Sequence, residues 1–126
     1  MIAKVTALYA LPLCVLYVAL SYRVIGIRKR LRVGLGDGGD AALNRAIRVH
    51  GNFAEYVPLA LIVIALAEIN GAAPWLVHVL GLLLLAGRCS HAWGVSQPVE
   101  NFRFRVFGML STFAVMVGGA AVALLA

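Results

Sequence analysis

The chain has 126 residues, of which 63% are hydrophobic and 13% are charged, and its formal net charge is +6. A small domain has too little interior to bury so much apolar surface, so this composition excludes a soluble globular protein and indicates that lipid solvates much of the chain. The positive charge does not indicate nucleic-acid binding, because the basic residues flank apolar segments, where they set topology and contact anionic lipid headgroups.

The first predicted membrane span covers residues 2–28. Eighteen uncharged residues separate Lys4 from Arg23, close to the ~20 that a helix needs to cross the hydrocarbon core. Pro12 lies inside this span and predicts a kink. No small-residue cleavage site with a soluble domain behind it follows, so we expect a retained helix rather than a signal peptide. The glycine-rich segment 33–40 is predicted to be a flexible turn, since it lacks the Gly-Lys-Ser/Thr ending of a phosphate loop.

The second predicted span covers residues 41–70 and begins in a polar stretch. Asp40 is a suitable N-cap for it, because an aspartate side chain accepts hydrogen bonds from the free N–H groups of a first helical turn. Asn70 and Gly71 form a stop signal at the other end.

The third and fourth predicted spans cover residues 74–93 and 99–126. Pro74 and Pro98 suit first helical turns, and the sequence after Arg105 carries no further charge. Short connections favour antiparallel neighbours. The sequence therefore predicts a single all-α domain, a four-transmembrane-helix up-down bundle.

The basic residues predict the orientation of this bundle. Ten of the eleven lie beside the first and third connections, and only Lys4 lies on the opposite side. The positive-inside rule places these two connections in the cytoplasm and both termini on the non-cytoplasmic side. The ten are Arg23, Arg28, Lys29, Arg30, Arg32, Arg45, Arg48, Arg88, Arg103 and Arg105.

The cysteines and two of the histidines are interpreted as structural. Cys14 and Cys89 lack the spacing of metal ligands or of a disulfide framework, so both are expected to be packing residues, and no metal site is predicted. His78 lies on an apolar span and is expected to pack or to form an interhelical hydrogen bond. His50 faces away from the polar stripe of the second span.

That polar stripe consists of Arg45, Arg48, Asn52 and Glu55, whose spacings of three, four and three residues place them on one helical face. Tyr56 lies beside it. Ionisable groups in a membrane helix normally face a partner or a water-filled cavity. Arg48 and Glu55 lie two turns apart, so we expect Asn52 to bridge them rather than a direct contact. The stripe is equally compatible with a structural clamp between helices.

A second polar group comes from the third and fourth spans. Arg88, His91 and Trp93 lie near the end of one helix, and Arg103 and Arg105 lie at the start of the next. The charge pattern places them at the same membrane side as the stripe. Together they predict a basic pocket for a small anion, and the forked guanidinium of arginine matches carboxylates in particular.

The segment from Arg48 to Pro58 resembles the MAPEG family, the membrane-associated proteins in eicosanoid and glutathione metabolism. The family pattern is Arg-x-x-x-Asn-x-x-Glu-(Tyr)-x-Pro on the second of four helices, and the chain has every element. The length, the four spans and the basic first connection agree as well. The resemblance implies a homotrimer in a membrane, here a bacterial inner membrane, with sites between neighbouring subunits on the cytoplasmic side.

The resemblance also implies roles for the polar residues. Many family members bind glutathione as co-substrate and use it on small lipophilic electrophiles or lipid hydroperoxides, a detoxification chemistry. By this resemblance Arg48, Asn52, Glu55 and Tyr56 hold glutathione, with Glu55 on its amino group. Arg105 stabilises the catalytic thiolate, and Arg103 is the second candidate.

Alternatives follow from the same residues. Many relatives that use glutathione carry tyrosines near the end of the third helix, where this chain has Cys89, His91 and Trp93. A non-catalytic lipid-binding or scaffolding protein is therefore the second hypothesis, and a small channel is a third. Gly118, Gly119 and Ala120 would allow helices to pack closely in a trimer.

Overall fold

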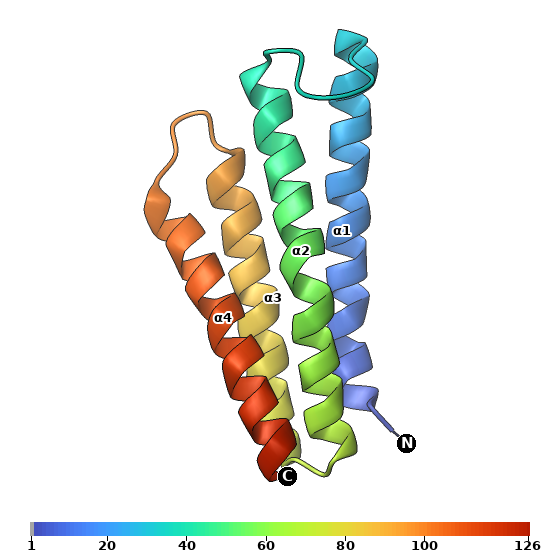
Figure 1. Ribbon diagram of the computed structural model, residues 1–126, viewed down its shortest axis with the longest axis vertical. Helices are drawn as coiled ribbons and strands as arrows, with labels where there is room; N and C mark the ends of the chain where they lie inside the picture. The colour runs from blue at the N-terminus through green and yellow to red at the C-terminus, as the bar shows by residue number, and fades with distance from the viewer. Residues whose placement is uncertain (1) are drawn as a thin grey trace.

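The structure, a computed structural model, describes residues 2–126 and consists of four α-helices: α1 (Lys4–Leu31), α2 (Ala41–Ile69), α3 (Pro74–Ser96) and α4 (Phe102–Leu125). The helices run alternately up and down, as predicted (Figure 1). The α1–α2 and α3–α4 connections lie at one end, which we call the loop end (residues 32–40 and 97–101). The α2–α3 connection and both termini lie at the other, the terminal end. All four helices are long and apolar enough to cross a membrane.

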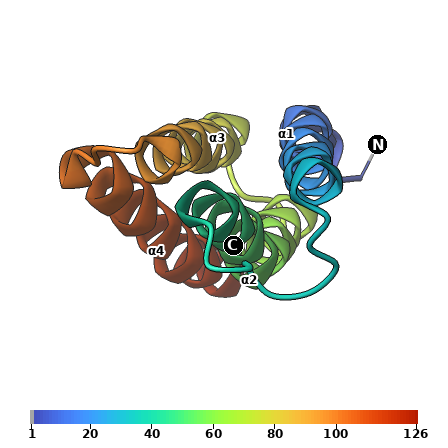
Figure 2. The same ribbon diagram turned by 90° about the horizontal axis from the view of Figure 1, so that it is seen from above.

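Helix α2 lies at the centre of the bundle. Helix α2 contacts each of the other three helices, as α3 also does, whereas α1 and α4 do not contact each other (Figure 2). The inward face of α2 carries a buried residue at almost every turn, which is the periodicity of a helix packed on one side. These residues are Leu43, Ala46, Val49, Phe53, Val57, Ala60, Ile64 and Ala67.

Local signals account for the starts of α2, α3 and α4. The Asp40 side chain accepts a hydrogen bond from the Leu43 N–H at 2.8 Å, which confirms the predicted N-cap of α2. Pro74 stands in the first turn of α3, also as predicted. The prediction that Pro98 opens the fourth helix is wrong, because α4 begins at Phe102 with Asn101 as its cap. The Asn101 side chain accepts a hydrogen bond from the Arg103 N–H at 3.1 Å. The chain from 97 to 101 is irregular.

Glycines bring α3 and α4 into close contact. A Cβ atom added at Gly108 would lie 2.5 Å from the Cβ of His91 and 2.6 Å from the carbonyl oxygen of Gly87. One added at Gly94 would lie 2.7 Å from the Cβ of Phe104. Real Cβ atoms do not approach other atoms so closely, so only glycine permits this helix spacing. The two arginine-bearing ends of α3 and α4 are thereby fixed side by side.

The terminal end is held by polar contacts between helices. The Glu68 carboxylate on α2 accepts the N–H groups of Val5 and Thr6 at 2.8 and 2.7 Å and the Thr6 hydroxyl at 2.6 Å. It therefore supplies acceptors for N–H groups that the first turn of α1 leaves without helical partners. The Asn70 amide donates to the Ala123 carbonyl at 2.8 Å at the end of α4.

His78 contributes to the same end of the bundle. Its Nδ1 lies 2.9 Å from the Tyr9 hydroxyl, and the two rings meet edge to face. The predicted interhelical hydrogen bond of His78 is thus confirmed, and it joins α3 to α1.

We predict that Glu68→Ala lowers the free energy of unfolding by about 2–3 kcal/mol, because it removes three hydrogen bonds to a charged acceptor and leaves two N–H groups of α1 unpaired. Thermal or denaturant unfolding in detergent, followed by circular dichroism, measures the change. Glu55→Ala on the same helix is the matched control. Its ion pair is half exposed, so we expect a change below ~1 kcal/mol. Equal effects of both substitutions would contradict the capping role.

Candidate anion-binding site

The polar stripe of α2 contains a direct ion pair between Arg48 and Glu55. The Arg48 Nη1 lies 3.6 Å from the Glu55 Oε1, and both side chains are 52% exposed. The expectation that Asn52 bridges them is therefore wrong. The helix rises about 10.5 Å over the seven residues from Arg48 to Glu55, but long side chains can cover this distance along an open helix face. Gly51 lies between them and leaves that face open, since a Cβ there would already contact both groups.

Asn52 instead compensates a buried arginine. Its Oδ1 accepts the Arg88 Nη2 at 2.6 Å, and the Arg88 Nη1 donates to the Thr112 hydroxyl at 3.3 Å. The guanidinium also lies 5.8 Å from the ring centroid of Phe53. Arg88 is 1% exposed, and no carboxylate of residues 2–126 forms an ion pair with it. Arg88 thus joins α2, α3 and α4 through neutral acceptors in the core.

The neighbours of Arg88 are distributed over the inside and the outside of the bundle. His91 is 3% exposed against α4, and its Nδ1 has no partner among the described residues. Trp93, in contrast, is 62% exposed on the outer face of α3. Tyr56 is half-buried, with its ring edge to face against Phe113 of α4. Of these three predicted site residues, Trp93 faces outward, whereas His91 and Tyr56 face the interior of the bundle.

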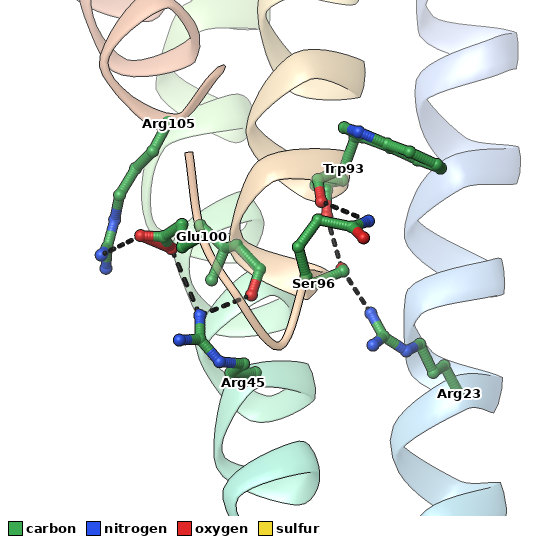
Figure 3. Close-up of polar contacts among 9 residues, drawn as sticks. Arg23, Arg45, Trp93, Ser96, Glu100 and Arg105 are labelled. Atoms are coloured by element: carbon green, nitrogen blue, oxygen red, sulfur yellow. Dashed lines mark hydrogen bonds and ion pairs between the residues drawn. The ribbon is translucent and has the colours of Figure 1, made fainter. Parts of the chain in front are cut away.

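A second cluster lies at the loop end, where Glu100 bridges two arginines (Figure 3). Its Oε1 is 3.3 Å from the Arg45 Nη1, and its Oε2 is 3.2 Å from the Arg105 Nη1. The Arg45 Nη1 also donates to the Val95 carbonyl at 3.0 Å. The Glu100 side chain is only 4% exposed.

Our sequence reasoning did not identify Glu100. A signal was available, because Glu100 is the one acidic residue between Glu68 and the C-terminus, in a region that holds three arginines. The identity of its partners depends on how segment 97–101 folds back towards α2, which no local pattern indicates.

A cavity of about 310 Å³ adjoins this cluster, lined by Ala41, Asn44, Arg45, Arg48, Val95 and Arg105. The structure therefore brings together three of the predicted arginines, two from α2 and one from α4. Arg103 is exposed and does not line the cavity. Several guanidinium groups around one cavity can bind a carboxylate or another small anion through paired N–H donors.

Helix α1 is attached to this end of the bundle by two contacts. The Arg23 guanidinium donates to the Ser96 hydroxyl at the end of α3 (Figure 3). The Ser21 hydroxyl lies 3.0 Å from the His50 Nε2, and the His50 ring stacks on Tyr17. His50 thus faces α1 rather than the polar stripe, as predicted.

A second, apolar groove of about 490 Å³ lies between α1 and α2. Among its lining residues are Leu13, Tyr17, Phe53 and Leu61, together with Cys14. The prediction that both cysteines are packing residues is wrong for the single chain, since Cys14 and Cys89 are free and exposed. A thiol behaves as a small hydrophobic group, so a lipid-facing position suits it.

These features define a multi-pass membrane protein, a four-helix bundle with an arginine-lined cavity at one end. A model of the MAPEG family matches residues 6–125. The inner membrane protein YecN of Escherichia coli (strain K12) is 42% identical over 113 residues, which cover 90% of this chain and 85% of YecN. YecN of Escherichia coli O6:H1 gives the same values. The chain belongs to the MAPEG family, which confirms the resemblance carried by the Arg48–Pro58 motif.

We predict that Asn52→Leu lowers the free energy of unfolding by about 2–3 kcal/mol, because it leaves the buried Arg88 without its shortest hydrogen bond. The double variant Asn52→Leu/Arg88→Met should recover at least ~1 kcal/mol of this loss, since it removes the unpaired charge as well. Unfolding in detergent of the wild type, both single variants and the double variant measures the coupling. Strictly additive losses would contradict the pairing.

Proposed function

We propose that the protein is a membrane-bound glutathione transferase or peroxidase that activates glutathione as a thiolate for attack on lipophilic electrophiles or hydroperoxides. The observation that carries this proposal is the convergence of Arg45, Arg48 and Arg105 around one cavity of about 310 Å³. Membership of the MAPEG family, which is named for eicosanoid and glutathione metabolism, supports glutathione as the ligand class.

The charges of the site match those of glutathione, which carries two carboxylates, one ammonium group and a thiol. Arg45 and Arg48 provide forked donors for the carboxylates. The Glu55 carboxylate is half exposed and already faces a cation, so it suits the ammonium group. Asn52 and Tyr56 lie further along α2, where Asn52 binds the buried Arg88 and Tyr56 packs against Phe113. The cavity volume lies at the lower end of the range for small-molecule sites, which is roughly 300–1,000 Å³.

Arg105 is the proposed catalytic residue. A guanidinium near the sulfur favours the charged form of the thiol and so lowers the thiol pKa. The thiolate is the nucleophile, so its population at neutral pH limits the rate of attack. In conjugation the sulfur forms a bond to the electrophilic carbon while the leaving group departs with its electron pair.

A homotrimer would complete the site from a neighbouring subunit. Several predicted ligand-binding groups face outward on the single chain, including Glu55, Trp93 and Arg103. A Cβ atom added at Gly118 would meet no other atom within 4 Å, which leaves α4 open to close helix packing, whereas Gly119 already packs on Val63. We further propose that the loop end faces the cytoplasm of a bacterial inner membrane, because it carries the basic residues, and that both termini lie opposite.

A lipid-binding role is the second candidate, and the apolar groove between α1 and α2 favours it. The groove is larger than the arginine-lined cavity and its lining is almost entirely apolar. An acyl chain would fit such a surface. The same groove would also serve a glutathione transferase as the place for its lipophilic substrate, so the two candidates differ in thiol activation alone.

We predict that the wild-type protein binds glutathione saturably and increases its thiolate absorbance near neutral pH, and that Arg105→Ala reduces this thiolate signal at least tenfold, the factor of about one pKa unit. The measurement is an ultraviolet titration of the purified protein in detergent, together with conjugation of glutathione to a generic aryl halide. Arg30→Ala is the matched control, because it removes the same charge from an exposed position at the loop end that does not line the cavity.

Each candidate has a distinct outcome. Equal losses in both arginine variants would contradict the specific role of Arg105. Absence of both glutathione binding and conjugation in the wild type would refute the transferase proposal. Co-purification of a lipid, with no response to Arg105→Ala, would then support the lipid-binding candidate.

A further inference from the structure

Glu100 is the most enclosed charged side chain of the arginine cluster. It is 4% exposed, whereas its partners Arg45 and Arg105 are 32% and 44% exposed. It reaches both through one carboxylate, with Oε1 on Arg45 and Oε2 on Arg105. The two guanidinium groups come from different helices, and Figure 3 shows the carboxylate between them. Without a negative group at this position, two like charges would repel each other.

Each arginine keeps donors for a further partner. Glu100 and the Val95 carbonyl engage only the Nη1 atoms. Among residues 2–126, the Nε and Nη2 atoms of Arg45 and Arg105 have no hydrogen-bond partner. Both side chains line the cavity, whereas Glu100 does not. An anionic ligand in the cavity would therefore bind guanidinium groups whose charge one internal carboxylate already offsets.

We propose that Glu100 is an internal counterion that competes with the anionic groups of the ligand for Arg45 and Arg105. The choice of glutathione as the ligand rests on the proposed function. The three arginines of the cavity and the glutamates Glu55 and Glu100 carry a net charge of +1. Without Glu100 the same groups would carry +2, so Glu100 lowers the positive charge that the cavity presents to an anionic ligand.

This role has two opposite consequences. Glu100 stabilises the fold, because it holds the α3–α4 connection on α2 and offsets the repulsion between two arginines. It also weakens anion binding, because its negative charge lies within 3.3 Å of both guanidinium groups. A purely structural tie would behave differently, since its loss would weaken folding and binding together.

The test compares the wild type with Glu100→Gln and with Asp37→Asn as the matched control. Asp37 lies in the α1–α2 connection at the same loop end, and its carboxylate accepts only the Gly39 N–H in the described part of the chain. Both substitutions remove one negative charge. The probes are glutathione and inorganic sulfate, a dianion without a thiol, each titrated calorimetrically into protein in the same detergent.

We expect Glu100→Gln to bind glutathione and sulfate about fivefold tighter than the wild type or more, and to melt at a lower temperature. Asp37→Asn should bind both probes within twofold of the wild type. Unchanged or weaker binding of both probes by Glu100→Gln would overturn the inference. Tighter sulfate binding without any glutathione binding would uphold the counterion and refute glutathione as the ligand. An equal gain in affinity by Asp37→Asn would show that the tighter binding comes from net charge alone, and this result would overturn the inference.

Discussion

The arrangement of the loop end depends on one constraint, that an arginine charge within a bundle of apolar helices needs compensating acceptors. The chain meets it in three ways. Arg88 is surrounded by the neutral oxygens of Asn52 and Thr112. Arg48 pairs with Glu55 on its own helix. Arg45 and Arg105 share Glu100. Because these acceptors belong to α2, α4 and the α3–α4 connection, charge compensation also fixes the relative positions of these elements.

The two ends of the bundle differ in how far their polar groups are paired within the chain. At the terminal end, the Glu68 carboxylate accepts three hydrogen bonds from Val5 and Thr6. These donors are therefore already paired within the chain and are not free for a ligand. Glycine contacts along α3 and α4 hold those helices together between the ends. The loop end instead carries partly exposed guanidinium groups with unused N–H donors beside a cavity. Such unused N–H donors are the groups that the proposed anionic ligand would engage.

Sequence patterns predicted the four helices and their order because hydropathy and capping act locally. Asp40 and Pro74 marked helix starts correctly, whereas Pro98 did not, since Asn101 caps α4 further along the chain. The Arg48–Pro58 motif led to the MAPEG family. The pairings were harder to predict, because they depend on side-chain reach and on tertiary contacts. The Arg48–Glu55 pair and the role of Glu100 both fall in this class.

The loop end is proposed to bind one small polyanion with a thiol, held between guanidinium groups of α2 and α4. An experimental structure of the protein with glutathione, determined in a lipid nanodisc, tests this claim most directly. We expect the carboxylates of the ligand within hydrogen-bond distance of Arg45 or Arg48 and its sulfur beside Arg105. Glutathione bound elsewhere, or a cavity in which these three side chains turn towards lipid, would contradict the claim.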